Sequence, residues 1–270
     1  MRVLRSVIDV RRVLASHRGG AGVGFAPTMG ALHDGHVALF NAARDDGGLV
    51  VASIFVNPAQ FDDPADLAAY PRTEARDAEI AAAANVDLLF IPPTEEVYPA
   101  GSATRVVLAG AALEFEGRAR PGHFDGVALV CAKLFNIVQP TAVYLGQKDA
   151  QQVAVLRQVV RDLDVPLEIR VVPTVREPDG LALSSRNVRL TPEDRARALA
   201  VPRGLVAGLQ AHRAGHDPVP PARAALADLD IDYVGVASFD GEPTLVVAVR
   251  VGVIRLIDNV PLNQPRLAGL

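Results

Sequence analysis

The sequence predicts an α/β protein, with a Rossmann-like, doubly wound parallel sheet followed by a smaller α+β domain. Short apolar runs rich in β-branched residues, such as 49–56 and 87–91, alternate with segments whose apolar residues recur at helical spacing. Polar residues crowd the points where these runs end and helices begin. Near the C-terminus, apolar runs follow one another too closely for crossover helices, which is typical of an antiparallel sheet. We expect residues 1–175 to form the first domain and residues 176–270 the second.

Composition narrows the class of protein. The 270 residues are 50% hydrophobic and 21% charged, which is typical of a globular chain with a sizeable core. A formal net charge of −4 gives no reason to expect a nucleic-acid or membrane-surface partner. Cys131 is the only cysteine, which excludes an internal disulfide and suits a reducing compartment. No apolar run approaches the roughly 20 residues needed to span a bilayer. We therefore expect a cytoplasmic protein without a membrane partner.

The most informative stretch is 27–36, PTMGALHDGH. It follows the apolar run 23–26 and precedes an amphipathic segment, so it is predicted to be a strand, a glycine-bearing turn and a helix start. His33 and His36 lie at the turn and in the first helical residues. A helix N-terminus carries unpaired N–H groups and a partial positive charge, so two imidazoles there favour a phosphate site. The alternative is a surface loop that happens to contain two histidines.

The strand expected over 49–56 stops at Asn57-Pro58 and is followed by Gln60. Ligands of open α/β sheets bind beyond the carboxyl ends of the strands, so these polar groups are well placed for one. Residues 62–76 are polar with two prolines and are predicted to form a mobile lid. A second polar group, residues 113–126, is expected to be a loop leading into a core-facing helix.

A further strand-to-helix junction begins at Gly146, after the predicted strand 142–145. Gly146 allows a ligand to approach the backbone closely, and Lys148 can neutralise phosphate. Asp149 suits either a ribose hydroxyl pair or a helix cap, and both interpretations stay open.

The segment 184–186, Ser-Ser-Arg, is suited to a polyphosphate because hydroxyls donate hydrogen bonds and a guanidinium spans two oxygens. Serine-rich loops are common, so this tripeptide alone is a weak signal. The sequence shows no metal-ligand spacing typical of zinc and no serine–histidine pair placed for nucleophilic catalysis. This combination favours catalysis by positioning and charge stabilisation, as in phosphoryl and nucleotidyl transfer, normally with magnesium bridging phosphate oxygens.

The remaining segments follow from the same periodicities. Thr191-Pro192 starts a long helix that we expect to end near Arg213. The other expected elements are a surface helix over 3–17, a helix over 77–84, a helix over 127–138, a helix to about 162, a strand over 168–172, a linker at 215–218, and strands over 231–239, 245–251 and 252–257.

Taken together, the motifs resemble those of the pantothenate synthetase (pantoate–β-alanine ligase) family, a branch of the HxGH nucleotidylyltransferase superfamily. The matching blocks occur in order along nearly the whole chain: PTMGALHDGH (27–36), SIFVNPAQF (53–61), YPR (70–72), RPGHF (120–124), KLFN (133–136), GQKD (146–149), QQ (151–152) and SSRN (184–187).

The resemblance implies a cytoplasmic homodimer of pantothenate and coenzyme A biosynthesis, an AMP-forming acid–amino-acid ligase. Such an enzyme uses ATP and Mg2+ to convert pantoate into an acyl-adenylate, releasing pyrophosphate. The amine of β-alanine then attacks, giving pantothenate and AMP. The resemblance also implies that the first domain binds ATP and pantoate and that the second closes over the active site.

Site residues follow from the resemblance by position. His33, His36, Lys148 and Arg186 would act in catalysis. Gln60, Gln152 and Met29 would bind pantoate, since neutral amides suit a substrate bearing two hydroxyls. The residues implied to contact ATP are Met29, His33, His36, Gly146, Lys148, Asp149, Val175, Leu183, Ser184, Ser185 and Arg186.

Some positions depart from the family pattern. Leu183 stands where methionine is common, and Ala150 stands where an aromatic residue is frequent. At Arg76-Asp77 the family leads us to expect acidic residues near the metal, so Asp77 is the one candidate magnesium ligand. Two other functions stay open: a nucleotidyltransferase that leaves AMP on its product, and a nucleotide-binding protein without activity.

Overall fold

The computed structural model describes residues 1–17, 20, 22–239 and 241–268. Its contacts divide the chain into two compact units. The first unit comprises Met1–Leu145 and Val155–Val172, and the second comprises Gly146–Ala154 and Pro173–Leu270. The main division thus falls three residues before the expected boundary at 175. The short segment Gly146–Ala154 groups with the second unit, which sequence periodicity did not predict.

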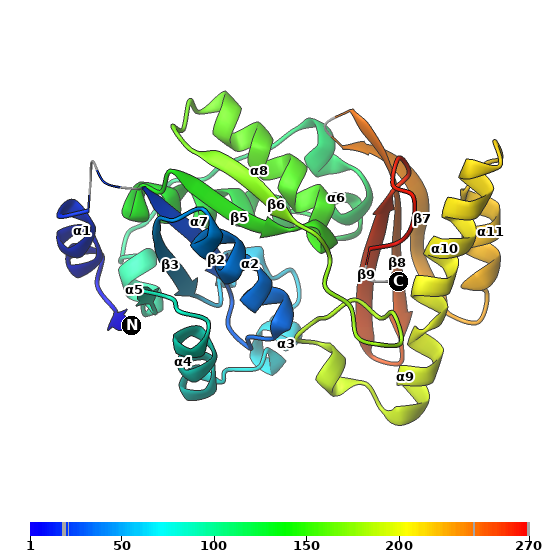
Figure 1. The fold of residues 1–270 in the computed structure, drawn as a ribbon, viewed down its shortest axis with the longest axis horizontal. Coiled ribbons are helices and arrows are strands. Elements are labelled where there is room, and N and C mark those ends of the chain that lie inside the picture. The colour runs from blue at the N-terminus through cyan, green and yellow to red at the C-terminus, as the bar shows by residue number, and fades with distance from the viewer. Residues whose placement is uncertain (18–19, 21, 240, 269–270) are drawn as a thin grey trace. The chain divides into compact units, whose positions relative to one another are not determined.

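The first unit is built on a six-stranded sheet of order β1-β4-β3-β2-β5-β6 (Figure 1). The pairs β1–β4, β4–β3, β3–β2 and β2–β5 are parallel. The central strands are continuous apolar runs because helices cover both faces of the sheet and bury the side chains on each face. The strands are β1 (Arg2–Leu4), β2 (Val23–Thr28), β3 (Leu49–Ile54), β4 (Leu88–Phe90), β5 (Ala142–Gly146) and β6 (Glu168–Val172).

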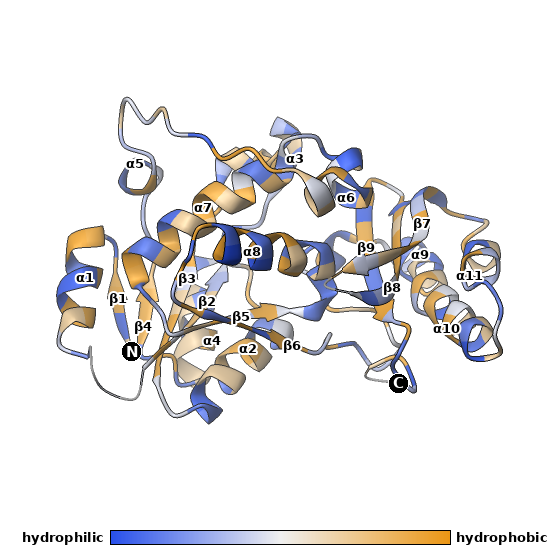
Figure 2. Cartoon of the chain, turned by 90° about the horizontal axis from the view of Figure 1, so that it is seen from above, coloured by the Kyte–Doolittle hydropathy of each residue, from blue (hydrophilic) through white to orange (hydrophobic). Residues whose placement is uncertain are grey.

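Helices lie on both faces of this sheet, which confirms the doubly wound prediction. Figure 2 shows α7 (His123–Val138) on one face and α2 (Asp34–Asp45) with α4 (Glu74–Ala83) on the other. Phe40 of α2 and Ala81 of α4 are fully buried against apolar strand residues. The other helices of this unit are α1 (Val7–Ala15), α3 (Pro64–Ala69), α5 (Thr94–Val97) and α6 (Phe115–Ala119), with 3-10 turns η1 (Pro58–Gln60) and η2 (Gly110–Leu113). The turn η3 (Gln147–Asp149) belongs to the second unit, and α8 (Ala150–Asp162) begins in the second unit and continues in the first from Val155.

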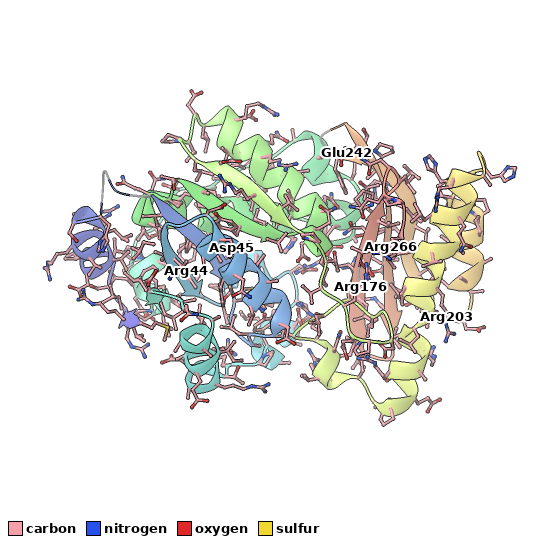
Figure 3. The ribbon with its side chains drawn as sticks, viewed as in Figure 1. Arg44, Asp45, Arg176, Arg203, Glu242 and Arg266 are labelled. Atoms are coloured by element: carbon pink, nitrogen blue, oxygen red, sulfur yellow. The ribbon has the colours of Figure 1, made fainter. Side chains whose placement is uncertain are left out.

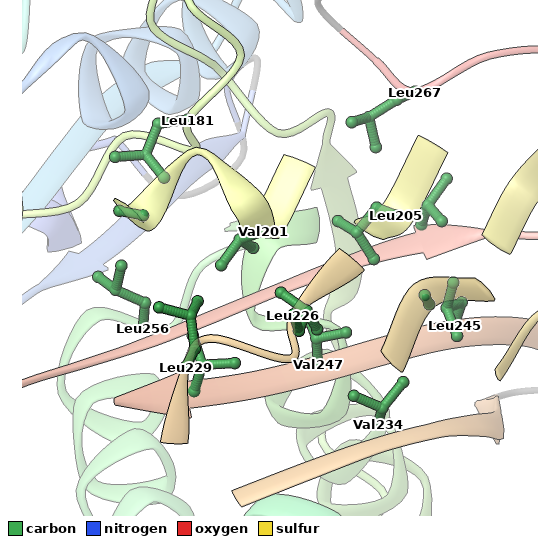
Figure 4. Close-up of a cluster of buried hydrophobic side chains, with 14 of the residues drawn as sticks. Leu181, Val201, Leu205, Leu226, Leu229, Val234, Leu245, Val247, Leu256 and Leu267 are labelled. Atoms are coloured by element: carbon green, nitrogen blue, oxygen red, sulfur yellow. The ribbon is translucent and has the colours of Figure 1, made fainter. Parts of the chain in front are cut away.

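The second unit contains an antiparallel sheet of order β7-β8-β9, as predicted. Its core lies between this sheet and two helices, where Leu205, Leu226 and Leu245 are fully buried (Figure 4). The elements are η4 (Asn187–Arg189), α9 (Pro192–Ala198), α10 (Ala200–Arg213), α11 (Val219–Ala225), β7 (Asp230–Phe239), β8 (Glu242–Val251) and β9 (Ile254–Pro261).

Several predicted elements were wrong in detail. Residues 2–4 form an edge strand rather than the start of a helix, because they pair with β4 at a distance in sequence that local periodicity does not report. The helix expected to run from Thr191 to Arg213 is interrupted at Leu199, although Thr191 caps its start as predicted. Helix α11 was not predicted, because its prolines at the first turn resemble a linker.

The two polar segments are also more ordered than expected. Residues 62–76 contain α3, which begins at Pro64 with the Asp63 side chain accepting from Ala65 N–H. Residues 113–126 contain α6, and α7 already begins at His123. Whether 62–76 moves as a lid stays a prediction. Among the described residues, no helix is long and apolar enough to cross a membrane.

Candidate active site

The turn after β2 brings the chain into α2 through two residues in the left-handed region. Gly30 has φ 81° and Ala31 has φ 49°. The Thr28 hydroxyl donates to Ser53 O at 2.6 Å and accepts from Gly30 N–H at 3.1 Å, which links the turn to β3. The turn that precedes the paired histidines is therefore held by specific contacts rather than being a loose surface loop.

His33 and His36 cap the helix that follows. His33 is the N-cap of α2, and its Nδ1 accepts from Gly35 N–H at 3.1 Å. His36 Nδ1 accepts from His33 N–H at 3.2 Å, which completes a capping box. Backbone N–H groups only donate, so each Nδ1 acts as an acceptor, which places the ring proton on Nε2. The ring centroids lie 4.2 Å apart. The arrangement presents imidazole N–H donors at a helix N-terminus, as a phosphate site requires.

Asp77 occupies a different role from the expected one. Its side chain is 1% exposed, and its two carboxylate oxygens accept from Ala31 N–H at 2.9 Å and Leu32 N–H at 2.8 Å. The Thr73 hydroxyl donates to the same group at 3.1 Å. Because protein donors already satisfy both oxygens, Asp77 does not fit the predicted magnesium contact. No group of three or more His, Cys, Asp or Glu side chains within the described ranges could hold a metal ion.

Gln60 and Met29, predicted to bind pantoate, lie together in the first unit. Gln60 Nε2 donates to Met29 Sδ at 3.0 Å, and Gln60 Oε1 accepts from Asn57 Nδ2 at 3.0 Å. Asn57 is 1% exposed and uses its amide fully: Nδ2 also donates to Gly126 O, and Oδ1 accepts from Ala59 N–H and the Tyr98 hydroxyl. The Gln60 amide is thus fixed with its nitrogen toward Met29.

In the second unit, Gly146, Lys148 and Asp149 lie in and beside η3, where β5 passes into α8. Lys148 Nζ lies 3.4 Å from Asp149 Oδ1. A Cβ at Gly146 would meet nothing within 4 Å, so protein packing does not require glycine there. Gln152 is half-buried in the first turn of α8. All four positions therefore belong to one short segment, 146–152.

The remaining predicted ATP contacts lie along a short hairpin of the second unit. Leu183 N–H donates to Val175 O at 3.0 Å, which pairs the two residues. Beyond the hairpin, Ser184 Oγ accepts from Arg186 N–H at 3.3 Å. Ser184, Ser185 and Arg186 are each half-buried. The structure therefore brings these predicted residues together within one loop.

A network of charged and polar side chains, Glu177, Asn187 and Arg195, holds the backbone next to the 184–186 segment. Glu177 accepts from Asn187 Nδ2 at 3.0 Å and from Arg195 Nη1 at 2.7 Å. The Arg195 hydrogen bond holds the pKa of Glu177 below its ordinary value. Asn187 also donates to Ala182 O at 3.0 Å. Residues from η4 and α9 thus fix the backbone that carries the Ser-Ser-Arg segment.

Asn259 is a residue that sequence reasoning missed. It lies in β9 at 4% exposure, and its Nδ2 donates to Gln147 O at 2.9 Å and Lys148 O at 2.8 Å. Its Oδ1 accepts from Gln147 Nε2 at 3.1 Å. A polar pair, Asp258-Asn259, between the apolar residues Ile257 and Val260 of the strand was the signal that could have marked it.

Asp258, next to Asn259, forms a buried ion pair with Arg176, which Figure 3 labels. The two hydrogen bonds measure 2.6 and 3.0 Å, and both side chains are 1% exposed. Arg176 Nε also donates to Ala268 O at 2.8 Å. This fork-to-fork pair anchors β9 beside the hairpin that carries Val175 and Leu183.

The parallel sheet and the appended antiparallel unit define a Rossmann-like α/β protein. Comparison with known proteins then specifies the family. A family profile described as pantoate-beta-alanine ligase matches residues 2–261. A pantothenate synthetase of Chloroflexus aggregans is 49% identical over 276 residues, covering 96% of this chain and 99% of its own. One of Moorella thermoacetica is 47% identical over 280 residues, covering 97% and 99%.

Two solved structures are similar over nearly the whole chain. Pantothenate synthetase from Thermus thermophilus has a TM-score of 0.93 at 43% identity, covering 98% of this chain and all of that one. Pantoate-beta-alanine ligase from Francisella tularensis, complexed with beta-gamma ATP and beta-alanine, has a TM-score of 0.84 at 34% identity, covering 98% of each. The chain belongs to the pantoate–β-alanine ligase family and is an acid–amino-acid ligase, EC 6.3.2.1. The resemblance inferred from the motifs is confirmed.

Proposed function

We propose that this chain condenses pantoate with β-alanine through a pantoyl-adenylate intermediate, using ATP and releasing first pyrophosphate and then AMP. Family membership supports the ligation itself. The ATP and β-alanine of the Francisella tularensis complex support the two co-substrates. The observation that carries the adenylation step is the capping box at the start of α2, in which the Nδ1 atoms of His33 and His36 accept backbone N–H groups and so orient both imidazoles.

In the proposed adenylation step, the pantoate carboxylate attacks the α-phosphorus of ATP and pyrophosphate leaves. Negative charge builds on the phosphate oxygens as this bond forms. His33 and His36 stabilise that charge as neutral donors that are already oriented by their Nδ1 hydrogen bonds. Because the helix N-terminus adds a partial positive charge, no imidazolium is needed.

The family resemblance supplies the remaining groups for ATP in this proposal. Lys148 and Arg186 neutralise the β- and γ-phosphates, and the hydroxyls of Ser184 and Ser185 donate to the same oxygens. At Gly146, where a side chain would meet no protein atom within 4 Å, the nucleoside approaches the backbone. Asp149 accepts from the ribose hydroxyls, with Val175 and Leu183 as apolar neighbours of the nucleoside.

Pantoate is proposed to bind through the amides of Gln60 and Gln152, beside Met29. The fixed orientation of the Gln60 amide supports this role, because a preset donor loses little entropy when it meets a hydroxyl. In the second reaction step, the β-alanine amine attacks the mixed anhydride carbonyl and AMP leaves.

Magnesium is expected to reach the reaction on the phosphate oxygens of ATP, because Mg2+ in phosphoryl-transfer sites is held largely by substrate phosphates and water. Asp77 does not fit as its ligand, since backbone donors occupy both oxygens. Homodimer formation, a cytoplasmic location and closure of the second domain over the site stay predictions.

The test is incubation of the purified chain with ATP and pantoate, with and without β-alanine. We expect pantoate-dependent exchange of labelled pyrophosphate into ATP without β-alanine, and stoichiometric AMP and pantothenate when it is added. Exchange without β-alanine-dependent AMP release would indicate the nucleotidyltransferase instead. Failure of both reactions, with ATP still bound, would indicate a nucleotide-binding protein without this activity.

A further inference from the structure

One charged cluster of the first unit takes no part in the proposed reaction. It lies between α6 and the start of α7 and faces η1, where Gln60 ends the 3-10 turn. We propose that His123 and Arg120 are positioning residues that clamp the main-chain carbonyl of Gln60 and so set its amide for pantoate. This inference rests on the proposed role of Gln60 as a pantoate ligand.

The clamp occupies both lone pairs of one carbonyl oxygen. His123 Nδ1 lies 2.7 Å from Gln60 O, and Arg120 Nη2 donates to the same oxygen at 3.2 Å. His123 is 8% exposed. The two donors come from residues 60 and 63 positions away in sequence, so tertiary contacts hold the turn in addition to its own backbone bonds, Gln60 N–H to Asn57 O and Phe61 N–H to Pro58 O, each 3.4 Å long.

The partners determine the tautomer of His123. A carbonyl oxygen only accepts, so Nδ1 carries the proton. Nε2 then accepts from Arg120 Nη1, which lies 3.3 Å away. Burial, reinforced by the Arg120 charge, lowers the pKa of His123 to about 4, so the ring stays neutral in this clamp at neutral pH. Both ring nitrogens therefore have assigned partners, and neither is available to accept a proton from a substrate.

Arg120 is itself fixed by two carboxylates. Its Nε donates to Asp62 Oδ1 at 2.9 Å, and its Nη1 lies 3.5 Å from Glu116 Oε1. Burial opposes ionisation of Asp62, but the hydrogen bond from Arg120 holds its pKa below the ordinary value. The guanidinium is 17% exposed. Asp62 and Glu116 thus orient the Arg120 guanidinium while it donates to Gln60 O.

The backbone of η1 also packs directly on α7. A Cβ at Gly126 would lie 2.0 Å from Ala59 O, so only glycine allows this approach. Asn57 links the two elements again, donating to Gly126 O at 3.1 Å and to Gln60 Oε1 at 3.0 Å. The Gln60 main chain is therefore set by the clamp, and its side chain is set by Asn57. Releasing the carbonyl would rotate the peptide and carry the amide away from its preset position.

The inference is tested by comparing His123→Ala and His123→Asn with the unaltered chain. An asparagine Nδ2 occupies nearly the position of the histidine Nδ1 and donates in the same direction, so it preserves the clamp. We expect His123→Ala to raise KM for pantoate by about 10-fold, the effect of losing one oriented hydrogen bond. KM for ATP should change by less than about 2-fold, because His33 and His36 have separate supports. His123→Asn should restore most of the pantoate affinity.

His216→Ala serves as the matched control, since that imidazole is exposed in the second unit. A purely structural role for His123 would give a different result. His123→Ala would then lower kcat and raise both KM values in proportion to its loss of Tm, and His123→Asn would not selectively recover the affinity for pantoate. That outcome would overturn the inference.

Gln60→Ala separates this inference from the function on which it rests. Unchanged KM for pantoate in Gln60→Ala would overturn the assignment of Gln60 itself. A raised KM in Gln60→Ala with an unchanged KM in His123→Ala would overturn only the clamp. If the clamp acts through Gln60, the double variant should be no worse than Gln60→Ala alone, because the two changes remove one interaction.

Discussion

Two turns carry the proposed phosphate chemistry, and they are held in different ways. In the turn of the first unit, residues 30–36, His33 and His36 cap their own helix, and Asp77 accepts from the Ala31 and Leu32 N–H groups before it. The turn of the second unit, residues 146–149, has no side-chain cap of its own. It is held instead by Asn259, more than 100 residues later in the chain.

The difference between the two turns shows two ways in which a protein can hold a reactive side chain in place. In the first turn each imidazole caps the helix through Nδ1 and is proposed to donate through Nε2, so structure and chemistry reside in the same side chains. In the second turn the amide of Asn259 fixes the backbone, and the Lys148 side chain remains a charge on a flexible stem. We therefore expect substitutions in the first turn to lower kcat and substitutions around the second to affect ATP affinity.

The largest effect is expected for His36→Ala. It removes an oriented donor for the developing phosphate charge, and losing one such donor costs about 10²–10³-fold in kcat. KM for pantoate should change far less. Steady-state kinetics with each substrate varied measures both, with His216→Ala as control. Undiminished turnover would show that His36 has no part in adenylation.

Asp77→Asn should rank second. The amide cannot accept from both Ala31 and Leu32 N–H groups, so the turn before His33 shifts, and a displacement of about 1 Å can cost up to about 100-fold in kcat. We also expect a Tm several degrees lower, because a buried N–H loses its acceptor. The half-saturating Mg2+ concentration should stay unchanged.

That Mg2+ titration separates the two roles of Asp77. A higher Mg2+ requirement at unchanged Tm would restore the metal-ligand interpretation that the geometry does not support. Asp228→Asn, which alters an exposed carboxylate of the second unit, is the matched control.

Asn259→Ala should have a smaller effect, concentrated on ATP. It removes two hydrogen bonds to the Gln147 and Lys148 carbonyls, so KM for ATP should rise by about 10-fold. KM for pantoate should change less, because Gln60 is proposed to bind that substrate. The control is Asn263→Ala, which alters an exposed residue of the same unit. Equal changes in both KM values would contradict the expectation that the second turn affects ATP affinity selectively.

The smallest expected effect is on folding stability, and it develops only as the pH falls below neutral and His123 takes up a proton. Burial lowers the pKa of His123 to about 4 in the folded chain, whereas the unfolded value is 6.5. The unfolded state therefore binds this proton first, and stability is lost as the pH falls from about 6.5 to 4. Glu177 of the second unit, whose pKa lies below 4.5, contributes loss only at more acidic pH.

Thermal unfolding from pH 7 to 5 should show a decrease in Tm of several degrees that His123→Asn reduces. Identical pH profiles for the two chains would show that His123 titrates normally in the folded state.

The candidate site residues have local signals in the sequence, whereas the groups that support them do not. His33, Gln60 and Lys148 were proposed because each lies where an apolar run meets a helix start, a local pattern that one chain displays, and their roles stay predictions. Asp77 was named as a candidate magnesium ligand from the family pattern at 76–77, whereas in the structure its carboxylate accepts from backbone N–H groups 45 and 46 residues away. No periodicity reports such a contact.

What the amino-acid sequence determined by itself is the alternation of strands and helices, the start of α2 and the family to which the motifs belong. These depend on contacts within a few residues, where side-chain chemistry and spacing suffice. The tertiary structure alone decided that residues 146–154 group with the second unit, that Asn259 fixes the Lys148 backbone, and that His123 faces Gln60. Those outcomes depend on which distant groups the fold brings within hydrogen-bond distance, and hydrogen bonds act only over about 3 Å.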